Sequence, residues 1–165
     1  MDEASARIDG LSRSGSLRFD DFYVSSASRI RRNLSVIIGD RDLARDATDE
    51  AMTKAYERWN RISRSVNPAG WVYRVGLNWA KRQMRRRSYD ITPLAAPTRT
   101  GEPAIPDPSL WKALDRLSND HRTVVVLRYS EDWSVAQIAE ALDIPPGTVK
   151  SRLHRALKQL REELE

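Results

Sequence analysis

The 165-residue sequence predicts an all-α protein of two small helical domains joined by an extended, proline-rich linker. Apolar residues recur at spacings of three and four through most of the chain, and no stretch alternates for long enough to make a sheet. By contrast, the segment 90–108 has no helical period and holds five of the eight prolines. The predicted divisions are a flexible N-terminal tail over 1–18, a first domain over 19–89, the linker over 90–108 and a second domain over 109–165.

Composition restricts the classes of function. A net charge of +5 favours a polyanionic partner. The chain has no cysteine, which excludes disulfides, thiol nucleophiles and cysteine-bound zinc, and is typical of a reducing compartment. The longest apolar runs, SVIIG and TVVVL, are too short to cross a bilayer. We therefore expect a cytoplasmic protein with no membrane span.

The first predicted helix ends near Gly39 and has an apolar stripe of Tyr23, Ala27, Ile30, Leu34 and Ile37. A second helix, from Asp42 to Trp59, has two contrasting faces. Its apolar stripe consists of Leu43, Ala47, Ala51, Met52, Ala55 and Trp59. Its opposite face is acidic and consists of Asp42, Asp46, Asp49, Glu50 and Glu57. This acidic face is either a solvated surface paired with Arg45 or Lys54, or a docking surface for a basic protein partner.

A third helix is predicted to begin at Pro68, with Asn67 as its cap. At 100° per residue, one narrow stripe of this helix carries positive charge and no carboxylate. The stripe consists of Arg74, Asn78, Lys81 and Arg85. It is either a solvated basic face or a phosphate-binding surface. The nearby aromatic residues Trp71, Tyr73 and Trp79 could stack on bases, but burial is the favoured interpretation for the two tryptophans.

The second domain is predicted to contain a helix-turn-helix. Ser109 and Ser118 are the expected caps of its first two helices, and the second of these is expected to bury Tyr129. Ser134 and Gln137 have the spacing of a capping box at the start of VAQIAEAL. The following DIPPG ends that helix and starts the last one, because proline is tolerated only in a first turn.

The last helix is predicted to face inward with Val149, Leu153, Ala156, Leu157 and Leu160. The outward residues offer only hydrogen-bond donors and positive charge. They are Thr148, Ser151, His154, Arg155 and Lys158, flanked by Lys150 and Arg152. Arginine can read guanine bidentately in the major groove, whereas lysine and threonine can hold phosphates. We therefore expect this helix to bind DNA.

Catalysis has little support in the sequence. His121 and His154 stand apart with no ligand-like spacing, and the chain has no glycine-rich phosphate loop. We expect no enzyme activity, no metal and no cofactor.

Three motifs in order resemble the extracytoplasmic-function (ECF) sigma factors of bacterial RNA polymerase. The motifs are GDRDLARDATDEAMTKAYERW, WVYRVGLNWAKRQMRRR and WSVAQIAEALDIPPGTVKSRLHRALKQLR. The resemblance covers about residues 19–90, as region two, and 109–163, as region four. It implies a promoter-specificity subunit whose partners are core RNA polymerase, through the beta-prime clamp helices and the beta flap, and promoter DNA, with an anti-sigma factor as a further candidate partner.

The resemblance also implies roles for individual residues. The acidic face, together with Lys54 beside it, would bind the core enzyme. These residues are Asp42, Asp46, Asp49, Glu50, Lys54 and Glu57. The loop before the third helix, mapped to 60–66, and the basic stripe would bind the minus-10 element: Asn60, Arg61, Ser63, Arg64, Arg74, Asn78, Lys81 and Arg85. The last helix would read the minus-35 element. The linker would thread the polymerase near the RNA path.

One alternative class stays open from the residues alone. A free-standing helix-turn-helix regulator, with a first domain that dimerises or senses a ligand, would bind duplex DNA unaided. A sigma factor would bind duplex DNA weakly alone and core polymerase tightly.

Overall fold

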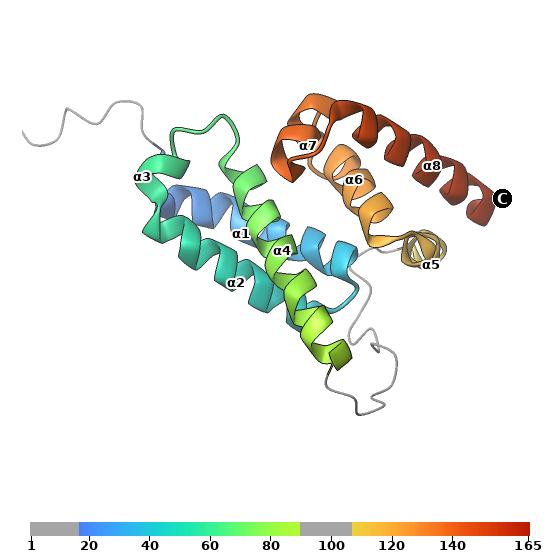
Figure 1. Cartoon of the computed structure of the whole chain (residues 1–165), viewed down its shortest axis with the longest axis horizontal. Helices are drawn as coiled ribbons and strands as arrows, with labels where there is room; N and C mark the ends of the chain where they lie inside the picture. The colour runs from blue at the N-terminus through green and yellow to red at the C-terminus, as the bar shows by residue number, and fades with distance from the viewer. Residues whose placement is uncertain (1–16, 90–106) are drawn as a thin grey trace, which may run out of the picture.

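The computed structural model describes residues 17–89 and 107–165, which contain eight helices and no strand, as the sequence predicts (Figure 1). The predicted tail and linker fall mostly on 1–16 and 90–106, outside the described residues. The helices are α1 Phe19–Ile38, α2 Arg41–Glu57, α3 Trp59–Ile62, α4 Pro68–Tyr89, α5 Pro108–Arg116, α6 Asn119–Tyr129, α7 Val135–Leu142 and α8 Pro146–Leu164.

An N-terminal group is formed by α1 to α4, with α1, α2 and α4 packed on one another. Local signals set the helix ends. Gly39 takes a left-handed φ of 78° after α1, and Asp40 accepts a hydrogen bond from the Leu43 amide at 2.9 Å to cap α2. Asn67 accepts from the Gly70 amide at 3.0 Å, which confirms the predicted cap of α4. The core between these helices includes Ile30, Leu34, Ala47, Ala51 and Val72.

Two sequence predictions about this group are wrong. Tyr23 was expected in the core but is 41% exposed, because the ring that turns inward is that of Phe22, 5.0 Å from the ring of Trp59. The second helix ends at Glu57 rather than continuing to Trp59, which instead begins the short α3.

A C-terminal group is formed by α5 to α8, with α8 packed against the other three helices. Ser118 caps α6, and Ser134 and Gln137 make both hydrogen bonds of the predicted capping box. The predicted cap Ser109 is wrong: Asp107 caps α5, so Ser109 lies inside the helix. Tyr129 is exposed rather than buried, because it is the last residue of α6 and its ring lies beside the guanidinium of Arg128.

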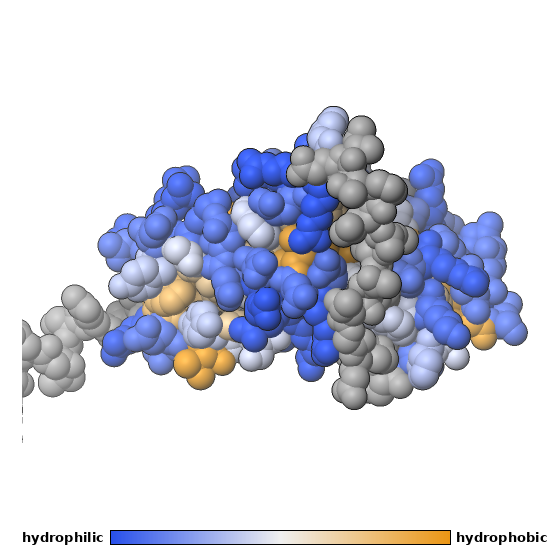
Figure 2. Space-filling view, turned by 90° about the horizontal axis from the view of Figure 1, so that it is seen from below, coloured by the Kyte–Doolittle hydropathy of each residue, from blue (hydrophilic) through white to orange (hydrophobic). Residues whose placement is uncertain are grey.

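The two groups pack against each other, α7 on α4 and α6 on α1 (Figure 1). The backbones of α4 and α7 approach closely at Gly70, where a Cβ would lie 3.0 Å from the Cβ of Ala141. Figure 2 shows that the face turned toward its viewer is mostly hydrophilic, with hydrophobic side chains in a few small patches. Within the described residues, no helix has the length and apolar character that crossing a membrane requires.

Candidate nucleic-acid interface

The last helix, α8, divides into two faces as the sequence predicts. It begins at Pro146, where a missing amide costs nothing, and it follows the sharp turn after α7 at Asp143. Four of the predicted inward residues are buried and Leu157 is partly buried. Of the predicted DNA-facing residues, five are exposed: Lys150, Ser151, His154, Arg155 and Lys158.

The other two DNA-facing residues of α8 are partly buried. Thr148 lies in the first turn, where its carbonyl accepts a hydrogen bond from the Ser151 hydroxyl at 3.0 Å. Arg152 is engaged by the carboxylate of Asp120 in α6 at 3.3 Å. The outer face of α8 therefore presents a continuous set of hydrogen-bond donors, in which the charge of Arg152 is already paired with that of Asp120.

On α4, the predicted basic stripe is open along most of its length. Asn78, Lys81 and Arg85 are exposed. Lys81 lies 3.9 Å from Asp120, the same carboxylate that pairs with Arg152. Trp71 and Trp79 are partly buried against the core, which agrees with the interpretation favoured from the sequence.

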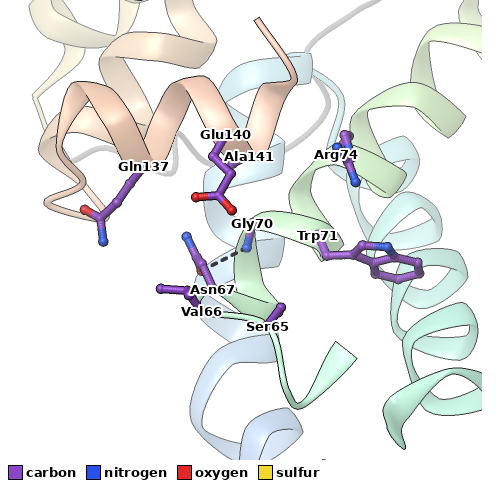
Figure 3. Close-up of a pocket in the computed structure, with 9 residues that line it drawn as sticks. All are labelled: Ser65, Val66, Asn67, Gly70, Trp71, Arg74, Gln137, Glu140 and Ala141. Carbon is purple, nitrogen blue, oxygen red and sulfur yellow. Dashed lines mark hydrogen bonds between the residues drawn. The ribbon is translucent and has the colours of Figure 1, made fainter. Parts of the chain in front are cut away.

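The fourth member of the stripe, Arg74, lines a cavity of about 180 Å³ between α4 and α7 (Figure 3). From α7, Gln137 and Glu140 reach into this cavity. From the segment before α4 come Ser65, Val66 and Asn67. At the N-terminal end of the stripe, Arg74 is therefore partly buried and lies at the cavity between the two helix groups, which the sequence did not predict.

The segment assigned to 60–66 as a loop is partly helical. Asn60 and Arg61 lie in α3 and are exposed, while Ser63 is partly buried at the following turn and Arg64 is exposed. Asn67 was predicted only as a cap, yet its Nδ2 is buried without a hydrogen-bond partner beside the cavity.

The acidic face of α2 is exposed at Asp42, Asp46, Asp49 and Glu57 and partly exposed at Glu50. Some of these carboxylates also form ion pairs with Lys54 and Arg45 of the same helix, one of the two interpretations that the sequence left open. Lys54 lies 2.9 Å from Glu50, and Arg45 lies 3.6 Å from Asp42 and 3.7 Å from Asp46. These pairs are solvent-screened, so most of the face remains available to a basic partner.

A polar cluster between the two helix groups was missed by the sequence analysis. The carboxylate of Glu131, at the end of α6, accepts hydrogen bonds from Arg29, Asn33 and Tyr73. Burial, reinforced by the charge of Glu131, raises the pKa of Tyr73 far above its usual range. The Tyr73 hydroxyl therefore stays protonated and acts as a donor, not as the base-stacking surface considered from the sequence.

The described residues contain no group of three or more histidine, aspartate or glutamate side chains arranged to hold a metal ion. Across 17–89 and 107–165, the chemistry offered is cationic and hydrogen-bonding on α4 and α8, and acidic on α2.

Comparisons with known proteins agree with this geometry. The family model of sigma-70, region 4, matches residues 108–160. The RNA polymerase sigma-E factor of Streptomyces avermitilis is 32% identical over 154 residues, covering 90% of this chain and 86% of the relative. The ECF RNA polymerase sigma factor SigL of Mycobacterium tuberculosis is 31% identical over 167 residues, covering 94% of each.

Among solved structures, the sigma factor RpoE from Bartonella quintana, crystallised with the anti-sigma factor NepR, has a similar fold. Its TM-score is 0.73 at 23% identity, and the match covers 88% of this chain and 96% of that one. At this identity the match supports the fold.

Proposed function

The chain belongs to the ECF sigma factors of RNA polymerase, and we propose that its three charged surfaces divide the work of promoter recognition among them. In this proposal, 19–89 is region two, which binds core polymerase and the minus-10 element. Residues 109–165 are region four, which reads the minus-35 element, and 90–108 links them. The protein acts in the cytoplasm and has no catalytic activity of its own.

The observation that carries the proposal is the outer face of α8. This helix, which begins at Pro146, buries its apolar side and leaves Ser151, His154 and Arg155 exposed at the centre of its outer face. In a helix that lies in the major groove, side chains at the centre of the outer face can contact base edges, and cationic side chains at its margins can hold phosphates. We assign Arg155 and Ser151 to base edges. We assign Lys158 and Arg152 to phosphates, and place Thr148, Lys150 and His154 on the same groove-facing surface.

The minus-10 element is assigned to α3, the turn after it, and the basic stripe of α4. Asn78, Lys81 and Arg85 lie exposed along one side of α4, and Arg74 extends that line to the turn. Cations along a helix suit a single strand of melted DNA, because they follow its phosphates without reading sequence. Asn60, Arg61, Ser63 and Arg64 flank the turn where an unstacked base would be captured.

Core polymerase is assigned to the acidic face of α2, where carboxylates would steer and hold the basic beta-prime clamp helices. Region four would bind the beta flap. An anti-sigma factor is a further partner of this chain, since the similar sigma factor from Bartonella quintana was crystallised with one.

The test is a salt series on reconstituted holoenzyme, with a promoter that it transcribes and single-base variants of the minus-35 element. Arg155→Ala should lower the affinity for the preferred sequence by about 1 to 3 kcal/mol and flatten discrimination at one position, because a bidentate contact is specific for one base. Lys158→Ala should weaken all sequences equally and reduce the slope of log affinity against log salt by about one.

Glu162→Ala is the control, since this exposed residue of α8 lies one turn beyond Lys158 and is not among the residues assigned to DNA. If Arg155→Ala lowers the affinity for every promoter equally while Lys158→Ala alters base preference, α8 lies in the groove rotated about its own axis from the orientation assigned here. If core enzyme with the wild-type chain initiates no better than core enzyme alone, the assignment to promoter recognition fails.

A further inference from the structure

One cation on the DNA-facing side of α8 already has an acidic partner. Nη2 of Arg152 lies 3.3 Å from Oδ2 of Asp120, which belongs to the first turn of α6. By contrast, Lys150, Arg155 and Lys158 are exposed and have no carboxylate partner among the described residues. The proposed minus-35 surface therefore contains one ion pair, and this pair joins α8 to the start of α6.

Arg152 lies at the margin of the outer face of α8, not at its centre. It is partly buried at the border with α6, whereas Arg155, three residues further along, is exposed. A cation at such a margin can hold a phosphate of the DNA backbone. The carboxylate of Asp120 lies at the same margin, so it approaches the same phosphates and repels them.

The ion pair is weak enough for DNA to displace. The side chains of Arg152 and Asp120 are 27% and 52% exposed, so water screens their attraction. Their separation is also longer than the roughly 2.7 to 2.9 Å of a charge-assisted hydrogen bond. A phosphate can therefore take the place of the carboxylate on Arg152, but the affinity for DNA is lower than it would be with a free arginine.

The place of Asp120 in α6 allows a simpler explanation of the residue. The first turn of a helix favours a negative charge, because the amino-terminal end of the helix dipole is positive. That explanation predicts an effect of Asp120 on folding stability and no effect on DNA binding. Measurements of DNA affinity therefore distinguish the two roles.

We propose that Asp120 competes with the DNA backbone for Arg152 and so lowers the affinity of region four for all duplex sequences alike. This inference rests on the proposed function. Base contacts by Arg155 and Ser151 do not involve Asp120, so the sequence-dependent part of the affinity is unchanged. The part that comes from phosphate contacts is smaller, which leaves a larger share of the binding to the residues that read bases.

The test is the affinity of reconstituted holoenzyme for a double-stranded promoter fragment at several salt concentrations. Asp120→Asn removes the charge and keeps the size of the side chain. Release of Arg152 should add one phosphate contact, so the slope of log affinity against log salt should steepen by about 0.9. Because about 0.15 M salt is about 0.8 of a decade below 1 M, the affinity at 0.15 M should rise about fivefold. This rise should be equal for the preferred minus-35 sequence and for its single-base variants.

Asp132→Asn is the matched control. Asp132 is fully exposed and lies 3.8 Å from Arg128, so this variant also frees an arginine and changes the net charge by the same amount. It should alter neither the affinity nor the salt slope, since neither residue belongs to the proposed DNA surface. If the two variants raise the affinity equally, the cause is net charge and the proposal is wrong.

A double-mutant cycle identifies the cation on which Asp120 acts, since Asp120 also lies 3.9 Å from Lys81 of α4. Asp120→Asn should no longer raise the affinity when combined with Arg152→Ala, but should raise it as before when combined with Lys81→Ala. A full effect of Asp120→Asn in the absence of Arg152 would overturn the proposal.

A comparison that leaves Asp120 in place keeps the proposal testable if Asp120→Asn fails to fold. Arg152→Ala alone should reduce the salt slope by clearly less than the reduction of about one expected for Lys158→Ala. Equal reductions would show that Asp120 does not restrain Arg152. Failure of the proposed function would look different, because then neither Arg152→Ala nor Lys158→Ala would change the slope.

Discussion

Replacing Arg122 with methionine should destabilise the protein more than any surface arginine would. The Arg122 side chain is 6% exposed and its guanidinium binds backbone carbonyls of α1 and α5 as well as the turn after α5. Four of these hydrogen bonds are well formed, with lengths of 2.8 to 3.1 Å to Ile37, Leu114, Asp115 and Leu117. Arg122→Met keeps an unbranched stem of the same length as that of arginine up to Nε but leaves these carbonyls without their donor.

The magnitude follows from these four bonds. Each contributes about 1 kcal/mol net, and carbonyls left buried without a donor add to the loss, so the free energy of unfolding should fall by about 3 to 5 kcal/mol. With an m-value of about 2 kcal/mol per molar urea, the unfolding midpoint should fall by about 2 M. The assay is urea unfolding followed by tryptophan fluorescence, with circular dichroism as a second probe of two-state behaviour.

Arg116→Met is the matched control. Arg116 is 67% exposed and pairs with Glu163 on the surface, so its loss should lower the free energy of unfolding by less than about 1 kcal/mol. If both variants lose the same stability, the bonds of Arg122 to the α1 and α5 carbonyls do not stabilise the folded state as argued.

Two further predictions concern α2 and α7. Reversing Asp46 and Glu50 to lysine should abolish binding to core polymerase in a titration while circular dichroism stays native, since neither side chain is buried in the hydrophobic core. Glu162→Lys is the control reversal. Unchanged affinity of the double variant for core polymerase would rule out the acidic face as the docking surface. Ser134→Ala should lower the free energy of unfolding by about 1 kcal/mol, because it removes the acceptor of the Gln137 amide; an unchanged urea midpoint would show that the cap contributes nothing measurable.

The helix ends could be predicted because their signals are local. Asn67, Ser118 and Ser134 each cap the helix that follows, using acceptors within three residues of the donor. The cap of α5 was misplaced at Ser109, because the helix begins two residues earlier than predicted, with Asp107 as its cap and Pro108 in its first turn. Burial of aromatic rings was less predictable, since it depends on partners far along the chain.

The outward faces of α2, α4 and α8 could also be predicted, because helical periodicity separates apolar from charged residues without knowledge of tertiary contacts. The partly buried state of Arg74 and Arg152 could not. Arg74 lines a cavity with Gln137 and Glu140 of α7, and Arg152 pairs with Asp120 of α6. Periodicity assigns a residue to a face but does not show what packs on that face.

The contact between the two groups lies beyond sequence reasoning for a physical reason. Glu131 meets donors 102, 98 and 58 residues away, and each member of the cluster alone is an ordinary polar residue at the edge of a helix.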